Sequence, residues 1–142
     1  MFVVLRVRGT SKLNGDVSDT LKILGLHKPH QCTFVPNNPS YLGMLKKAEG
    51  CVAWGEVTPE LLEKLIEVRG KSTDPKAKKV DAKAAAKKIL EGKIKESGIN
   101  PVLKLCPPKK GFARKGVLHG FGQGGELGYQ KEKINELIER MI

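Results

Sequence analysis

A chain of 142 residues with a hydrophobic content of 39% is about one domain long and near the globular range of composition, which predicts one core and excludes wholesale disorder. Its 26 Lys and Arg residues face only 15 Asp and Glu residues, and the pI near 9.7 indicates a polyanionic partner, either nucleic acid or an anionic membrane surface. No apolar run approaches the ~20 residues of a membrane-spanning helix and no signal peptide is recognised, so nucleic acid is favoured.

The first predicted element is a strand over residues 2–8, whose side chains alternate between two faces. Positions 3, 5 and 7 are apolar and share one face, whereas Arg6 and Arg8 lie on the other. If helices cover the apolar face, the two arginines lie on an open face of the sheet that presents charge to a partner.

Two more strands and three helices are predicted before residue 70. Apolar residues at helical spacing favour helices over residues 17–24, 41–48 and 58–70. β-Branched and aromatic residues favour strands over residues 32–35 and 51–54. The order strand, helix, strand, helix, strand, helix with short connections predicts a small α/β sandwich, although it leaves the strand order open.

The positive charge is concentrated in residues 71–118. This segment holds thirteen Lys and Arg114 against four acidic residues, a net charge of +10, whereas the rest of the chain holds 12 basic and 11 acidic residues, a net charge of +1. A polar loop begins the segment, and a helix over residues 82–90 follows, with a thin apolar stripe and a lysine side. After a brief apolar stretch at residues 102–105, a long basic, Gly-rich loop is expected over residues 109–125.

A last helix is predicted near residues 134–141, where apolar residues recur at helical spacing. It is expected to dock on the globular part of the chain. The predicted organisation is therefore a compact α/β core over residues 1–70, a basic RNA-binding extension over residues 71–128 and a docking C-terminal helix over residues 129–142.

No catalytic or metal-binding constellation is recognised, and no cofactor is expected. Gly120–Gly125 matches the GxGxxG pattern, but no strand precedes it and too few residues follow it for a dinucleotide fold, so glycines that lie close to a phosphate chain are favoured. His27, His30 and Cys32 carry zinc-competent groups, yet a fourth ligand is missing. Core and loop positions explain them better.

Cys32, Cys51 and Cys106 are odd in number and widely spaced. They fit small buried side chains in a reducing compartment better than a disulfide framework, which places the protein in the cytoplasm. Trp54 lies within a predicted strand, where a core position is favoured over a base-stacking role.

The lysine-rich segment is the strongest functional signal. A net +10 would repel itself unless something anionic neutralised it, and Lys and Arg read phosphate positions rather than base sequence. Few aromatic residues interleave the charges, so docking on folded RNA is favoured over stacking on a single strand. The predicted RNA contacts are Arg6, Arg8, Lys76, Lys78, Lys79, Lys83, Lys87, Lys88, Lys109, Lys110, Arg114, Lys115 and His119.

Several segments resemble the ribosomal L-thirty family of the large subunit, in its long archaeal and eukaryotic form. Their order and spacing along the chain carry the resemblance. The segments are Phe2 to Gly9, Leu24-Gly25-Leu26-His27, Pro39-Ser40-Tyr41 with Met44-Leu45, Val52-Ala53-Trp54-Gly55, Gly124-Gly125-Glu126 and Ile134 to Met141.

The resemblance implies a three-stranded antiparallel sheet with two helices on one face, in a β-α-β-α-β order similar to ferredoxin-like folds. It also implies a structural constituent of the large ribosomal subunit that binds rRNA beside neighbouring ribosomal proteins and has no catalytic activity. Eukaryotic members add a basic N-terminal helix that this sequence does not show, so the archaeal form is expected. A basic architectural DNA- or RNA-binding protein outside the ribosome, or more distantly a small-molecule-binding α/β domain, remains the alternative.

Overall fold

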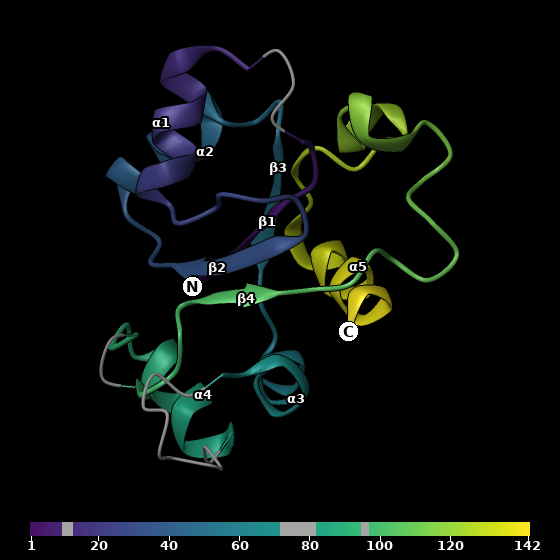
Figure 1. Cartoon of the computed structure of the whole chain (residues 1–142). Coiled ribbons are helices and arrows are strands. Elements are labelled where there is room, and N and C mark those ends of the chain that lie inside the picture. The colour runs from purple at the N-terminus through teal and green to yellow at the C-terminus, as the bar shows by residue number, and fades with distance from the viewer. Residues whose placement is uncertain (10–12, 72–81, 95–96) are drawn as a thin grey trace.

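A computed structural model describes the chain in four stretches, residues 1–9, 13–71, 82–94 and 97–142. Five strands form one mixed sheet in the order β4-β2-β1-β3-β5 (Figure 1). The central strand β1 pairs antiparallel with β2 and β3, β4 pairs antiparallel with β2, and β5 pairs parallel with β3. The strands are β1 (Phe2–Arg6), β2 (Gln31–Val35), β3 (Val52–Glu56), β4 (Val102–Lys104) and β5 (Gly128–Tyr129).

The helices predicted from apolar periodicity are confirmed, with bounds within a few residues of those expected. They are α1 (Gly15–Ile23), α2 (Pro39–Lys47), α3 (Pro59–Arg69), α4 (Ala82–Leu90) and α5 (Ile134–Met141). Short 3-10 turns, η2 (Gly116–Leu118), η3 (Phe121–Gln123) and η4 (Lys131–Lys133), occupy the region where the sequence predicted an irregular loop and the start of the last helix. Among the described residues, no helix is long and apolar enough to cross a bilayer.

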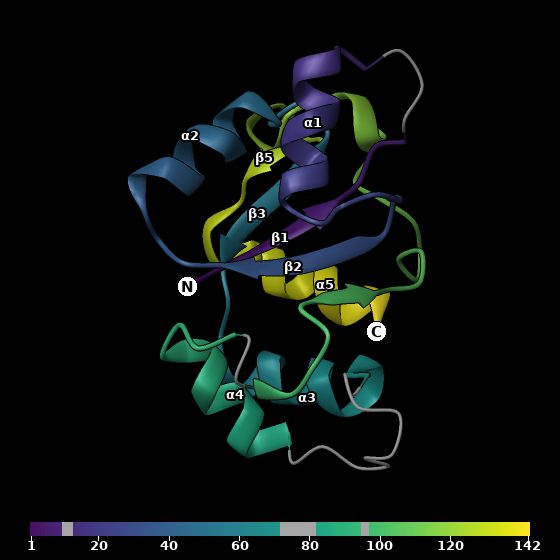
Figure 2. The same ribbon diagram turned by 60° about the vertical axis from the view of Figure 1, so that its left-hand side comes forward.

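Both faces of the sheet are covered by helices, so the expected open face does not exist. On one face, Phe2 and Val4 pack with apolar residues of α1 and α2. On the other, Val3, Leu5 and Val7 pack with α3 and α5. Figure 2 shows α1 and α2 on one side of β1 and β2, and α3 and α4 on the other. The two-sided cover follows from the sequence of β1, because its second face is also apolar at its first two positions and gains stability by burial.

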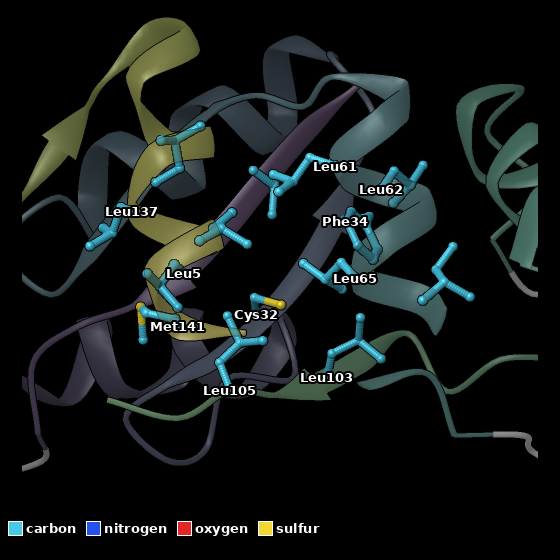
Figure 3. Close-up of a cluster of buried hydrophobic side chains, with 14 of the residues drawn as sticks. Leu5, Cys32, Phe34, Leu61, Leu62, Leu65, Leu103, Leu105, Leu137 and Met141 are labelled. Carbon is cyan, nitrogen blue, oxygen red and sulfur yellow. The ribbon is translucent and has the colours of Figure 1, made fainter. Parts of the chain in front are cut away.

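The larger core joins segments that are far apart in the sequence. Figure 3 shows Leu5 of β1, Cys32 of β2, Leu65 of α3, Leu103 of β4 and Met141 of α5 around a common interior. Burial of each such leucine contributes about 1.5–3 kcal/mol. The basic segment is therefore tied into this core through β4, and α4 joins the same cluster through its own apolar stripe.

The α/β class and the antiparallel trio β2-β1-β3 are confirmed, whereas the expectation of only three strands is wrong. The two additional strands are three and two residues long. Periodicity cannot identify strands that short, because they exist only by pairing with the edges of β2 and β3. They cover edges that would otherwise expose unpaired backbone groups.

Candidate nucleic-acid interface

Arg6 does not reach the surface. Its side chain is 2% exposed, and its guanidinium donates hydrogen bonds to the carbonyl oxygens of Leu26 at 2.6 Å, His27 at 3.0 Å and Arg8 at 3.0 Å. Burial lowers the pKa of this guanidinium from its ordinary value, opposed by the nearby Cys51 thiol. The expectation that Arg6 presents charge on an open face is wrong, because α1 and the loop after it cover that face. Arg8, which follows β1, is partly exposed.

The three lysines predicted on α4 all lie at the surface. Lys83, Lys87 and Lys88 are exposed, whereas the buried stripe of the helix consists of Ala85, Ala86 and Ile89. Positions i and i+4 of a helix share one side, so Lys83 and Lys87 form a ridge one turn apart. The helix therefore packs its small apolar residues against the core and exposes its lysines to solvent.

A second group of predicted cations lies on the chain between β4 and β5. The buried carboxylate of Glu126 shapes this segment, because it accepts hydrogen bonds from the backbone N–H of Ala113 at 3.0 Å and from the Gln130 amide at 3.1 Å. Arg140 lies 3.4 Å from the same carboxylate. The segment exposes Lys109, Lys110, Arg114, Lys115 and His119.

These two groups do not form one patch. Figures 1 and 2 place α4 at one end of the molecule and the turn η2, which directly follows Arg114 and Lys115 in the chain, at the other. Lys76, Lys78 and Lys79 lie outside the described residues. The α4 lysines and the residues next to η2 thus lie toward two separated ends of the molecule, whereas the backbone N–H of Lys109 donates to the carbonyl of Arg140 in α5.

Six exposed cations of the two groups take part in none of the ion pairs found within the described part of the chain. The ion pairs there involve Lys22, Lys47, Lys64 and Arg140. The exposed side chains of Lys83, Lys87, Lys109, Lys110, Arg114 and Lys115 are in none of them. Their charge is therefore available to an external anion.

A small concavity, here called the cationic hollow, adds three cations that the sequence interpretation did not select. It encloses about 350 Å³ and is lined by Arg69, Lys71, Lys104, Asn100 and three apolar or glycine residues, with no acidic residue among them. The backbone N–H of Asn100 donates a hydrogen bond to the carbonyl oxygen of Lys71 at 3.0 Å. This bond joins the chain after α3 to the chain before β4. Only the sign of each charge was visible in the sequence, since the fold alone brings these positions together.

A second concavity, here called the aromatic hollow, encloses about 600 Å³. It is lined by Glu56, Phe121, Tyr129, Gln130, Lys131, Glu132 and Lys133. The hydroxyl of Tyr129 donates to Glu56 Oε1 at 3.1 Å, and Lys133 Nζ lies 5.6 Å from the centre of the Phe121 ring. The sequence interpretation missed this site because its two aromatic residues lie in different elements, Phe121 in η3 and Tyr129 in β5, with no periodic spacing.

Comparison with known proteins identifies relatives along the whole chain. Residues 2–52 match the model of the family described as "Ribosomal protein L30p/L7e". The chain is 39% identical over 152 residues to "Large ribosomal subunit protein uL30" of Methanococcus vannielii, covering 99% of each chain. Its identity to the protein of the same description from Nanoarchaeum equitans is 37% over 153 residues, covering 100% of this chain and 99% of the relative. The chain belongs to the ribosomal protein L30p/L7e family.

Family membership confirms the resemblance drawn from the sequence motifs, including its archaeal form. The alignment with the relatives runs beyond the matched core, through the basic segment and α5, so the whole fold described above is that of an L30p/L7e family protein. The matched residues contain β1 and β2 in full and end at Val52, the first residue of β3.

In this L30p/L7e family chain the cysteines are free but not all buried. Cys32 and Cys51 are buried, and burial raises the pKa of Cys32 to about 12. Cys106 is exposed, so the expectation that it is a buried thiol is wrong. It lies directly after the apolar stretch, where β4 has already ended, and its sulfur accepts a hydrogen bond from Arg69 at 2.8 Å. Trp54 is 5% exposed, which confirms its position in the core.

The glycine pattern serves the turn around η3. Gly124 has φ +87°, and a Cβ at Gly125 would collide with the carbonyl oxygen of His119. These glycines are therefore required by the backbone path itself. A dinucleotide-binding turn would connect a strand to a following helix. Here the glycines surround the short turn η3, and the next element in the chain is the strand β5. Among the described residues, no group of three or more His, Cys, Asp or Glu side chains is arranged to hold a metal.

Proposed function

We propose that this chain is a structural constituent of the large ribosomal subunit that binds and positions rRNA through phosphate contacts and performs no catalysis. Its relatives are described as large ribosomal subunit proteins. The observation that carries the proposal is the pair of exposed cation groups on one packed body, the lysines of α4 at one end and Arg114 and Lys115, next to η2, toward the other. A rigid body with two cationic ends suits fixing two RNA segments at a set spacing.

Phosphate neutralisation gives the proposal a magnitude. Each Lys or Arg that meets a phosphate releases condensed counterions, which makes affinity fall with salt. If about eight cations are engaged, the log of the binding constant falls with the log of the salt concentration at a slope near −6 to −7. We propose the cationic hollow as a third place for a phosphate, because three cations and no acidic residue line it.

The remaining members of the set take supporting places in the proposal. Arg8 and His119 are proposed as contacts at the surface, and Lys76, Lys78 and Lys79 stay in the proposed set of phosphate contacts. Arg6 is excluded from the contacts because it is buried. Neighbouring ribosomal proteins are proposed as further partners. The proposed role involves no membrane and no small-molecule substrate.

The test compares RNA with DNA at matched salt. In the first experiment the full chain is titrated with large-subunit rRNA and with duplex DNA of equal length. In the second, the protein is crosslinked in a cell extract and the RNA attached to it is sequenced. We expect tighter binding to the rRNA and enrichment of large-subunit rRNA among the crosslinks. Equal affinity for duplex DNA together with scattered crosslinks would contradict the proposal and indicate a general architectural protein.

A further inference from the structure

The aromatic hollow differs in chemistry from the phosphate-binding surfaces. Its walls come from the end of β3, the turn η3, the strand β5 and the turn η4. Its volume of about 600 Å³ lies in the range of pockets that enclose small organic groups, roughly 300–1,000 Å³. None of its lining residues belongs to the cation set predicted from the sequence. It therefore calls for an occupant other than a bare phosphate.

Tyr129 provides a fixed aromatic surface in this hollow. Its ring centre lies 6.2 Å from that of Phe2, edge to face, and 6.2 Å from that of Trp54. Its hydroxyl is held by Glu56, yet 41% of the residue remains exposed. Burial, and then the hydrogen bond and charge of Glu56, raise the pKa of the phenol, which keeps it neutral. A rigid, neutral ring with exposed area is suited to stacking.

The turn η4 brings positive charge to the rim. Lys131 has φ +53°, a left-handed conformation that is uncommon and strained for a residue with a side chain. Gly55 makes room for this turn, because a Cβ there would collide with the carbonyl oxygen of Lys131. Such strain clusters at functional sites. Lys133 lies over the ring of Phe121, so both lysines of the turn are placed beside an aromatic lining.

The same hollow contains two exposed carboxylates, Glu56 and Glu132. They repel a phosphate in the interior, but they accept hydrogen bonds from an amino group. An apolar side chain of a protein partner would desolvate both carboxylates and offer them no hydrogen bond, which is costly. A nucleobase satisfies all three features, since its face stacks on aromatic rings, its amino edge meets carboxylates and its flanking phosphates meet lysines.

We propose that the aromatic hollow receives one unpaired, amino-bearing nucleobase of rRNA, stacked on Tyr129 and Phe121 with its amino group on Glu56 or Glu132 and its flanking phosphates on Lys131 and Lys133. Adenine, guanine and cytosine carry such a group and uracil does not. The inference rests on the proposed function, because it takes the partner to be RNA, and it adds base selection to contacts that otherwise read only phosphates.

The experiment uses the full chain and short single-stranded oligoribonucleotides with a single 2-aminopurine among uracils. Stacking on an aromatic ring quenches 2-aminopurine emission, and anisotropy of a labelled strand gives the affinity. We expect quenching by the wild type, and a loss of affinity of roughly 5- to 150-fold in Tyr129→Ala, the range found for base–aromatic contacts. Tyr129→Phe retains most of the affinity because it keeps the ring. An all-uracil strand binds more weakly, and Glu56→Gln reduces that preference.

Controls separate the base site from folding and from the general function. Leu118→Ala removes an exposed apolar side chain outside the hollow and should leave quenching unchanged. Circular dichroism verifies the fold of Tyr129→Ala, and Phe121→Leu provides a second removal of an aromatic surface. Absence of quenching, with equal affinities for the wild type, Tyr129→Ala and Phe121→Leu, overturns the base site.

The experiment also distinguishes a hollow that binds a protein partner from a failure of the proposed rRNA-binding function. If Tyr129→Ala blocks incorporation into the large subunit while oligonucleotide binding and quenching are unchanged, the hollow docks a protein and the inference is overturned. If the wild type does not bind large-subunit rRNA at all, the proposed function fails whatever the quenching shows. Normal, salt-sensitive rRNA binding without quenching overturns the base site alone.

Discussion

Arg6 shows how the same residue type serves opposite purposes at positions two residues apart. Its charge is buried, and burial of a charge is tolerated only when hydrogen bonds replace water. Three backbone carbonyls do so, and two of them belong to the loop after α1. Arg8 keeps part of its side chain in solvent. The first arginine therefore holds the fold together, and the second is free to meet a partner.

Replacement of Arg6 by Met should reduce the free energy of unfolding by about 2–3 kcal/mol, because it leaves buried carbonyls without donors. Arg8→Met is the matched control and should change stability by less than about 0.5 kcal/mol. Urea denaturation of both variants measures the difference. Affinity for rRNA should be unchanged in the folded Arg6→Met protein. A loss of affinity without a loss of stability would show that Arg6 contacts RNA after all.

Thiol reactivity should separate the three cysteines. Burial raises the pKa of Cys32 to about 12 and also raises that of Cys51, so both stay protonated and inaccessible at pH 8. A disulfide reagent at that pH should modify one thiol per native chain, at Cys106, and three after unfolding. Because the pKa of Cys32 is raised from 9.0, its contribution to stability is present below pH 9 and is lost as the pH rises toward 12. Rapid modification of Cys32 at pH 8 would contradict the buried position.

At the scale of elements, α4 illustrates a helix that presents charge by burying small residues. Ala85, Ala86 and Ile89 pack into the core cluster that includes α3, and the lysines lie on the other side. Alanines let the helix approach closely, but each contributes little buried area. The position of the α4 lysines thus depends on a thin apolar contact.

Ala86→Asp should detach α4, because it places a carboxylate in that contact. Ala84→Asp adds the same charge at an exposed position of the same helix and serves as the matched control. Ala86→Asp should weaken rRNA binding more than Ala84→Asp does, although every lysine is retained. Hydrogen exchange should show loss of protection in α4 only for Ala86→Asp. Equal effects of the two variants on affinity would mean that the position of α4 does not matter for binding.

At the scale of the molecule, the sheet acts as a spacer between two cationic ends. The α4 lysines lie at one end and the group around η2 at the other, on a body whose cores on both sheet faces are packed. If both ends bind RNA as proposed, the packed body between them fixes the distance between the two RNA segments. Such positioning requires no pocket chemistry, which is consistent with a structural role.

Each end should contribute separately to the salt dependence of rRNA binding. The double variant Lys83→Gln with Lys87→Gln should reduce the log–log slope by roughly 1.5–2, and so should Lys110→Gln with Lys115→Gln. The two losses should add when the pairs are combined, because the sites are far apart. Lys28→Gln with Lys46→Gln removes two exposed lysines outside the predicted set and is the control. A control that lowers the slope as much would show that net charge alone, rather than its location, drives binding.

The sequence by itself determined the local elements and the kind of partner. Helices such as residues 82–90 and 134–141 follow from a periodicity of a few residues, and the excess of lysine over acid is a property of composition that folding does not alter. The motifs were sufficient to indicate the family, because they lie in the same order along related chains. The phosphate contacts remain predictions.

Only the tertiary structure decided where those charges lie and which side chains share a site. Whether Arg6 is buried depends on α1 and its following loop, and strands as short as β4 and β5 form only against partners distant in the sequence. Phe121 and Tyr129 converge with Glu56 because a parallel pairing of β5 with β3 brings them there. The physical reason is the same in each case: these contacts join residues far apart in the chain, and local periodicity carries no information about such pairs.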